Sequence, residues 1–342
     1  MIAIEDVRQL TLETLGTLTV LTGDDLGQYA QLRESLLEVI GFDKASLSFS
    51  YFDLAEDDYQ KAQLDLESLP FLSDYKVVIL DNVLDITTTK KHHLDESSLK
   101  QFEAYLEAPV SSTKLIVLAP GKLDSKRRLV KLLKRDGKVI EAKKPKEAEL
   151  KTYFQQYAHQ HGLVFEKGAF EELLHRSGFD YASLHKNMAF LIAYQTEGQI
   201  SLEDIAEAIP KTLQDNIFEL TKLVLNKRVA ESLALVADLR LQGEDEIKLI
   251  AIMIGQFRLF MQVSILSSRG QSEYQIKESL SDYLGRSVNP YQIRYAIRDS
   301  RGLSYAFLAK SLILLIETDA AIKKGLYDKS YLFELALLKL MA

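Results

Sequence analysis

The segment TGDDLGQYAQL, residues 22–32, follows an apolar run and stands where a nucleotide-binding protein would carry its phosphate loop. Such a loop needs two glycines with four residues between them, then Lys and Ser or Thr, because amides, an ammonium group and a hydroxyl must converge on the phosphates and magnesium. Gly23 and Gly27 are one position too close, and Gln28 and Tyr29 occupy the places of the Lys and the hydroxyl residue. The segment therefore predicts no working phosphate loop.

A second place for chemistry is VVILDN, residues 77–82, where an apolar strand would deliver Asp81 to a magnesium ion. The next residue, Asn82, cannot take a proton from water as a general base would. The simpler interpretation is that both residues begin a loop. His159 and His161 could be a ligand pair, but no third ligand is evident and a surface pair is favoured. We expect no catalytic site, cofactor or metal.

The composition is that of a soluble globular protein with two or three domains. The chain has 342 residues, of which 47% are apolar and 27% charged. It has no cysteine, which excludes disulfides, thiolate metal sites and cysteine nucleophiles and fits a reducing cytoplasm. The N-terminus lacks a signal-peptide pattern, and no uninterrupted apolar stretch approaches the ~20 residues of a membrane span. We expect a cytoplasmic protein.

The pattern of elements predicts an α/β domain followed by helices. Short strand-like runs occupy residues 18–21, 47–52, 76–80, 114–119 and 138–141. Amphipathic segments lie between them, one with Asp95 as N-cap, which is typical of a parallel sheet covered on both faces. After Lys146 the strand pattern stops. Ser201 and Asp204 form a capping-box pattern in this helical part. The expected domains are 1–145 (α/β), 146–210 (small, helical) and 211–342 (larger, helical).

Charge is distributed unevenly along the chain. The net charge is −7, but Lys122 to Lys146 contains eleven Lys or Arg against three Asp or Glu, a local net of +8 that leaves −15 elsewhere. A basic face of this kind suits a polyanion or an acidic partner. The alternative is a solvated amphipathic helix with Leu129, Leu132 and Leu133 buried. Both interpretations stay open.

An apolar cluster, Leu69-Pro70-Phe71-Leu72, stands directly before the run of residues 77–80 that predicts a buried strand. Tyr59, Ala62, Leu66 and Leu69 share one face of a predicted helix and are expected to pack it onto the sheet. Pro70 disfavours a helical conformation at Leu69 and turns the chain. Phe71 and Leu72 would then project as an aromatic and aliphatic anchor for a partner. The alternative is that they are ordinary core.

Six segments, in this order and spacing, resemble the delta subunit family of the bacterial clamp loader, part of the DNA polymerase III holoenzyme. They are residues 68–82, 114–145, 216–228, 250–263, 289–304 and 314–325. The resemblance covers nearly the whole chain. It implies an AAA+ type fold: an α/β domain with a degenerate nucleotide site, a helical lid, and a C-terminal collar that joins a five-subunit ring with ATPase subunits and delta prime.

The implied function is to bind the sliding clamp (beta) and open it for loading onto primed DNA without ATP hydrolysis by this chain. The chain would have no active site of its own but would belong to a DNA-directed DNA polymerase, a nucleotidyltransferase. The implied clamp-binding element is Phe71 with Leu72, Leu69 and Pro70. Some family members have a leucine directly before the phenylalanine; here that position is Pro70, so the partner of Phe71 is either Leu72 or Leu69.

The basic segment is similar to the stretch after the fourth strand in this family. Its residues would contact DNA phosphates or a neighbouring subunit, two alternatives that stay open. They are Lys122, Lys126, Arg127, Arg128, Lys131, Lys134 and Arg135. A rival function is a DNA-binding regulator with a recognition helix opened by Pro290 and lined by Arg294, Arg298 and Arg301. That hypothesis leaves the α/β domain without a role.

Overall fold

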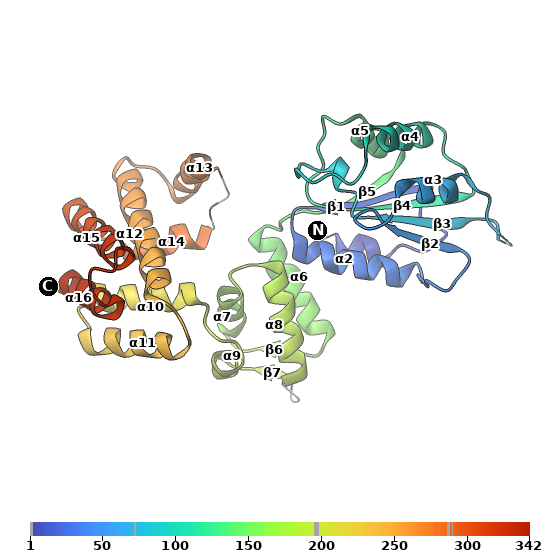
Figure 1. Cartoon of the computed structure of the whole chain (residues 1–342). Helices are drawn as coiled ribbons and strands as arrows, with labels where there is room; N and C mark the ends of the chain where they lie inside the picture. Colours follow the sequence, from blue (N-terminus) through green and yellow to red (C-terminus); the bar gives the residue numbers. More distant parts are fainter. Residues whose placement is uncertain (1–2, 72, 195–197, 286–287, 289) are drawn as a thin grey trace. The chain divides into compact units, whose positions relative to one another are not determined.

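The computed structural model describes residues 3–71, 73–194, 198–285, 288 and 290–342. The chain forms two compact units, residues 1–209 and 210–342 (Figure 1). The N-terminal unit has a hydrophobic core on each face of its sheet, and the C-terminal unit has one core of its own.

A five-stranded parallel sheet forms the centre of the N-terminal unit, as the sequence predicted. Its strands are β1 (Leu18–Gly23), β2 (Phe49–Asp53), β3 (Lys76–Asp81), β4 (Thr113–Pro120) and β5 (Lys138–Ala142). The order across the sheet is β2-β3-β4-β1-β5, and every pairing is parallel. The β3 strand therefore lies between β2 and β4, away from either edge of the sheet.

Helices cover both faces of this sheet (Figure 1). One face packs against α1 (Ile4–Arg8) and α2 (Leu26–Val39), and the other against α3 (Tyr59–Glu67), α4 (Glu96–Glu107) and α5 (Arg128–Asp136). Successive strand residues point to opposite faces. Accordingly, Val77 and Ile79 join the core under α2, whereas Val78 and Leu80 join the core under α3. A short 3-10 helix, η1 (Leu84–Ile86), follows β3.

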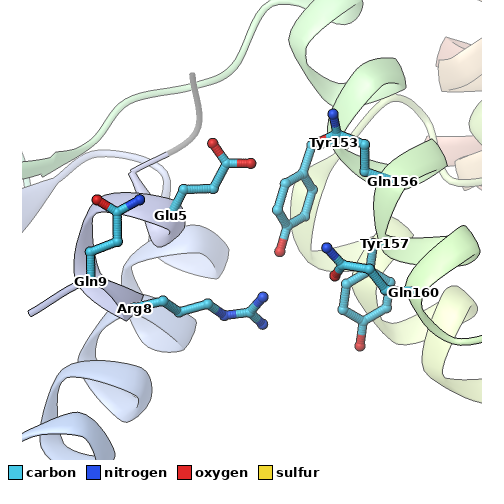
Figure 2. A pocket seen from close by; sticks show the side chains of 7 residues that line it. All are labelled: Glu5, Arg8, Gln9, Tyr153, Gln156, Tyr157 and Gln160. Carbon is cyan, nitrogen blue, oxygen red and sulfur yellow. The ribbon is translucent and has the colours of Figure 1, made fainter.

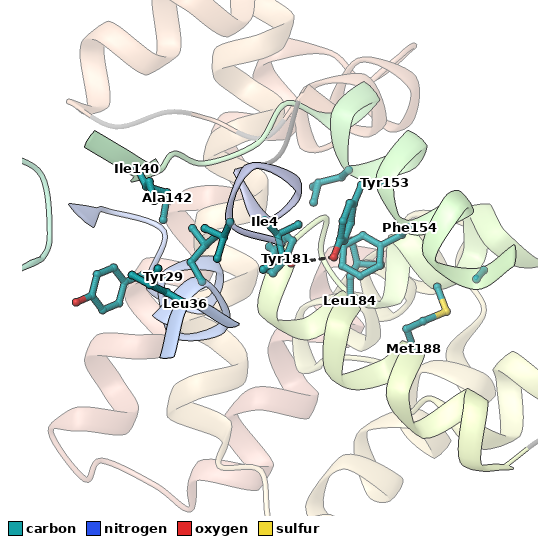
Figure 3. Close-up of a cluster of buried hydrophobic side chains, with 14 of the residues drawn as sticks. Ile4, Tyr29, Leu36, Ile140, Ala142, Tyr153, Phe154, Tyr181, Leu184 and Met188 are labelled. Carbon is teal, nitrogen blue, oxygen red and sulfur yellow. Dashed lines mark hydrogen bonds between the residues drawn. The ribbon is translucent and has the colours of Figure 1, made fainter. Parts of the chain in front are cut away.

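Four further helices complete this unit: α6 (Glu147–Gln160), α7 (Ala169–Arg176), α8 (Tyr181–Tyr194) and α9 (Leu202–Ala208). Their apolar side chains join the core beneath α1 and α2 (Figure 3). The prediction that strands stop after Lys146 was wrong in one detail, because β6 (Val164–Phe165) and β7 (Gln199–Ile200) pair in parallel. Two residues are too few to produce a recognisable strand pattern.

The C-terminal unit is helical throughout its described residues. It contains α10 (Leu213–Leu225), α11 (Val229–Leu241), α12 (Glu246–Ser268), α13 (Glu273–Leu284), α14 (Pro290–Asp299), α15 (Tyr305–Lys323) and α16 (Lys329–Met341). By length and composition alone, α12 could cross a membrane. It packs against α10, α14, α15 and α16, and Phe257 and Phe260 are fully buried in the core of the unit.

Both predicted helix starts are confirmed. The Asp95 carboxylate accepts a hydrogen bond from the Ser98 amide (2.7 Å) at the start of α4. Ser201 and Asp204 form a reciprocal capping box at α9. Such caps satisfy amides that have no partner within the helix.

Asp81, expected only to begin a loop, is instead a buried member of an ion pair. Its carboxylate accepts hydrogen bonds from Nε (3.0 Å) and Nη2 (2.6 Å) of Arg33 on α2, and from the Tyr51 hydroxyl on β2. Burial and the Asp81 carboxylate raise the pKa of Tyr51 to about 12, so its hydroxyl stays protonated at neutral pH. Asn82 does begin a loop, with φ of 55°. The cluster ties α2 to the carboxyl end of the sheet.

We expect Arg33→Met to lower the free energy of unfolding by about 2 kcal/mol, because it leaves the Asp81 charge buried without its partner. The effect is smaller than for a fully buried pair, since 34% of the Arg33 side chain is exposed. Urea denaturation measures it. Arg135→Met, which removes an exposed ion pair with Asp136, is the matched control and should leave stability unchanged. Equal stability of the two variants would contradict the expectation.

Candidate functional site

The corner between α3 and β3 carries large apolar side chains in water. The exposed fraction is 78% for Leu69 and 67% for Phe71, while Pro70 is half-buried. Leu72 lies outside the described residues. Leu69 and Phe71 are therefore not core residues, and two neighbouring exposed apolar side chains make this corner a candidate contact surface.

The expectation that Leu69 packs α3 onto the sheet was wrong. Tyr59, Ala62 and Leu66 are buried against the sheet and α4, as predicted. The helix ends at Glu67, however, and Ser68 already has an extended conformation (ψ 156°). Helical spacing therefore does not extend to Leu69, which points away from the core.

Leu64 is a third exposed apolar side chain, 73% exposed, on the last turns of α3. The sequence prediction did not include it, because the apolar spacing of this helix marks only the buried stripe. The available signal was that Leu64 is the one apolar residue of this helix outside that stripe. We call the three residues that follow Ser68 at the end of α3, namely Leu69, Pro70 and Phe71, the apolar corner.

The basic segment forms a loop and the amphipathic helix α5. Leu129, Val130, Leu132 and Leu133 are buried beneath it, so the amphipathic pattern is real. Of the seven candidate basic residues, Arg127 is half-buried and the other six are exposed. The three arginines are paired with acids: Arg127 with Asp124 (3.5 Å), Arg128 with Glu103 (3.9 Å) and Glu107, and Arg135 with Asp136 (2.7 Å).

The lysines of the segment differ from its arginines. Lys134 lies 3.4 Å from the Ser125 hydroxyl. Within the described part of the chain, Lys122, Lys126 and Lys131 form no ion pair. An ammonium group without an ion pair can bind a phosphate without first breaking a contact with a carboxylate. These three lysines are therefore the strongest candidates of the seven for a polyanion contact.

The junction of β1 and α2, where a phosphate loop would stand, is closed by the chain itself. The Asp25 carboxylate accepts a hydrogen bond from the Gln28 amide (3.0 Å) and so occupies the N-terminus of α2. Burial raises the pKa of Asp25. A Cβ atom on Gly27 would lie only 2.4 Å from the Ala182 Cβ on α8, so α8 packs closely on this helix start. The anion site of a helix N-terminus is thus filled.

A separate polar pocket of about 220 Å³ lies between α1 and α6 (Figure 2). It is lined by Glu5, Arg8, Gln9, Tyr153, Gln156, Tyr157 and Gln160. These groups offer hydrogen bonds but no nucleophile paired with a base.

No group of three or more His, Cys, Asp or Glu in the described ranges could hold a metal ion. His161 instead approaches the Tyr157 carbonyl oxygen through Nδ1 (2.8 Å) and packs on the Tyr157 ring. This contact engages one of the two histidines that spacing alone had marked as a ligand pair.

Comparisons with known proteins agree for both units. Residues 20–143 match the family model "DNA polymerase III, delta subunit", and residues 214–340 match "DNA polymerase III delta subunit, C-terminal domain". The DNA polymerase III subunit delta of Bacillus subtilis is 30% identical over 305 residues, 89% of this chain and 86% of that protein. The solved structure of the Bacillus subtilis DNA clamp loader delta protein (YqeN) aligns with a TM-score of 0.66 at 26% identity, covering 99% and 98% of the two chains.

We expect no saturable binding of a fluorescent ATP analogue to the isolated chain at micromolar concentrations. The reason is twofold. The Asp25 carboxylate occupies the N-terminus of α2 and would repel a phosphate, and the close packing of Gly27 against Ala182 leaves no space for one. Fluorescence anisotropy measures this, with a phosphate-loop ATPase as positive control. Saturable binding that Asp25→Lys strengthens would show that this junction is a nucleotide site after all.

Proposed function

This chain belongs to the family of DNA polymerase III delta subunits, and we therefore propose that it binds the sliding clamp through its apolar corner. It is a clamp loader subunit and acts in DNA replication. The single observation that carries the proposal is the exposure of Leu69 and Phe71 on a corner between two rigid elements. Aromatic and aliphatic side chains that fill a pocket dominate binding hot spots.

The proposed action is to open, or hold open, one interface of the ring-shaped clamp so that it can be placed on primed DNA. Binding energy of this chain, rather than hydrolysis of ATP by it, would drive this step; the closed β1–α2 junction supports that view. ATP would be used by partner subunits. We propose assembly with ATPase subunits and delta prime in a five-subunit ring, through the helical C-terminal unit, in the cytoplasm.

The apolar corner offers two partners for Phe71. Leu69 is exposed beside it, and Leu72 follows it in sequence but lies outside the described residues. Leu64, exposed on α3 before the helix ends at Glu67, is a further candidate for this anchor. We propose Phe71 as its centre, since an aromatic ring offers the largest apolar area to bury.

The basic segment is proposed to contact DNA within the loader, through Lys122, Lys126 and Lys131 first. The alternative of a contact with a neighbouring subunit rests on the arginines, which already engage acids and would suit an acidic partner as well. The rival function, a DNA-binding regulator, has less support. The family match at residues 214–340 includes the helix α14 on which that hypothesis depends.

Phe71→Ala combined with Leu72→Ala should weaken binding to the sliding clamp of the same cell by at least about 30-fold, equivalent to ~2 kcal/mol. The loss follows from removing the anchor that fills the clamp pocket. Isothermal titration of the full chain with the clamp measures it. Leu26→Ala, which truncates an equally apolar exposed residue at the start of α2, is the control. A folded double mutant with wild-type affinity would rule out the corner as the contact.

Lys126→Gln combined with Lys131→Gln should flatten the salt dependence of DNA binding by the assembled loader. Each lost phosphate contact reduces the slope of log K against log salt by about 0.9. The measurement is a salt titration of loader affinity for primed DNA. Lys310→Gln with Lys324→Gln, two exposed lysines of the C-terminal unit, serves as the charge-matched control. If the Lys126→Gln, Lys131→Gln variant keeps the wild-type slope, as the control should, these lysines do not contact DNA phosphates.

A further inference from the structure

The first residue of β3, Lys76, is a buried lysine directly behind the apolar corner. Only 5% of the residue is exposed. Lysine is almost never buried unless its ammonium group is paired, because removing the charge from water is costly. We therefore expect the ammonium group of Lys76 to make specific contacts inside the protein.

The ammonium group of Lys76 binds the C-terminal end of α3. Nζ donates to the Asp65 main-chain carbonyl, lies 3.1 Å from Asp65 Oδ1, and donates to the Ser68 hydroxyl oxygen (2.6 Å). The last carbonyls of a helix lack partners within the helix and carry partial negative charge. The Asp65 carbonyl also accepts hydrogen bonds from the Ser68 amide (3.2 Å) and the Ser68 hydroxyl (3.0 Å), so the particular contribution of Lys76 is a positive charge at the helix end.

These contacts also close the segment that carries the corner. The chain leaves α3 at Ser68, passes Leu69 and Phe71, and returns at Lys76, so the 2.6 Å contact joins the two ends of the segment. A second tie lies nearby, where the Thr113 hydroxyl on β4 donates to the Leu66 carbonyl (3.3 Å). Both ends of the segment that carries the corner are therefore held in place, although the side chains of the corner are exposed to water.

Asp65 makes the dependence on Lys76 stronger. Among the described residues, its buried Oδ2 atom has no hydrogen-bond partner, so Lys76 supplies the main neutralising contact of this carboxylate. Without the ammonium group, a partly buried charge would be left beside the helix end. Water would then have to enter to solvate it, which would loosen the α3 terminus.

We propose that Lys76 is a positioning residue for clamp binding, which holds Leu69 and Phe71 in the binding geometry before the clamp is met. This inference rests on the proposed function of the apolar corner. A segment that is already ordered loses less conformational entropy on binding than a mobile one. Lys76 acts through Phe71 and touches no partner itself, since it is buried.

The test is a double-mutant cycle on the full chain, read out as affinity for the sliding clamp. Lys76→Met should weaken binding by about tenfold, the cost of ordering one or two side chains on binding. In a Phe71→Ala background the same change should weaken binding by less than about twofold, because the central side chain of the anchor is no longer there to be positioned. A merely structural role would give the same loss in both backgrounds.

Arg176→Met is the matched control. Arg176 on α7 is also buried, and its Nη1 donates to the carbonyls of Ile205 (3.3 Å), Ala206 (3.2 Å) and Ile209 (2.5 Å) at the end of another helix of this unit, α9. It should leave clamp affinity unchanged. Hydrogen exchange of the Ser68 amide, which donates to the Leu64 carbonyl (3.1 Å) at the end of α3, should be faster in the free Lys76→Met chain than in wild type, and unchanged in Arg176→Met.

Ser68→Ala covers the case in which Lys76→Met does not fold. Ser68 is exposed. Its substitution removes the hydroxyl contacts with Lys76 and Asp65 and keeps the contact between Lys76 and Asp65. It should weaken clamp binding in the same direction by a smaller factor. The proposal is overturned if Phe71→Ala weakens binding but Lys76→Met and Ser68→Ala do not, or if their losses persist in the Phe71→Ala background. If Phe71→Ala itself has no effect, the proposed function of the corner fails first, and this inference fails with it.

Discussion

Parallel pairing of β3 between β2 and β4 is the interaction on which the N-terminal unit depends. Val77, Val78, Ile79 and Leu80 are buried against cores on both faces, so a one-residue slip would send every side chain to the wrong side. The first residue of the strand, Lys76, fixes the base of the apolar corner, and its last residue, Asp81, closes the ion pair with Arg33. The two ends of one strand therefore fix the geometry of the apolar corner and of the ion pair with α2.

The two faces of the sheet are covered by different helices, and both candidate contact regions lie on one of them. The face of α1 and α2 is covered further by α6 to α8, whose side chains share its core. The helices α3, α4 and α5 cover the other face, and both candidate contact regions come from them: the apolar corner after α3 and the basic segment that includes α5. Core packing on one side of these helices thus leaves their other side available to partners.

Local patterns made much of the fold predictable. The five strands were recognisable because each is a short apolar run, and Asp95 and Ser201 because caps obey fixed spacing. What escaped prediction depends on residues far apart in sequence. Asp81 meets Arg33 across 48 positions, Lys76 reaches back to the end of α3, and β6 pairs with β7 across an intervening helical hairpin. The exposure of Leu69 was missed because the helix stops two residues before it, and element ends are the least defined feature of a periodic pattern.

The close approach of Gly27 to Ala182 limits which substitutions the start of α2 can accept. A phosphate loop here would need an inserted residue after Gly23 and a Lys and a hydroxyl residue in place of Gln28 and Tyr29, both of which are buried. Each of these changes alone would disturb the contact of α2 with α8 or the core around Tyr29, with no gain in nucleotide affinity until all were present. The packing of α8 on the helix start therefore means that no single substitution can turn this junction into a nucleotide site.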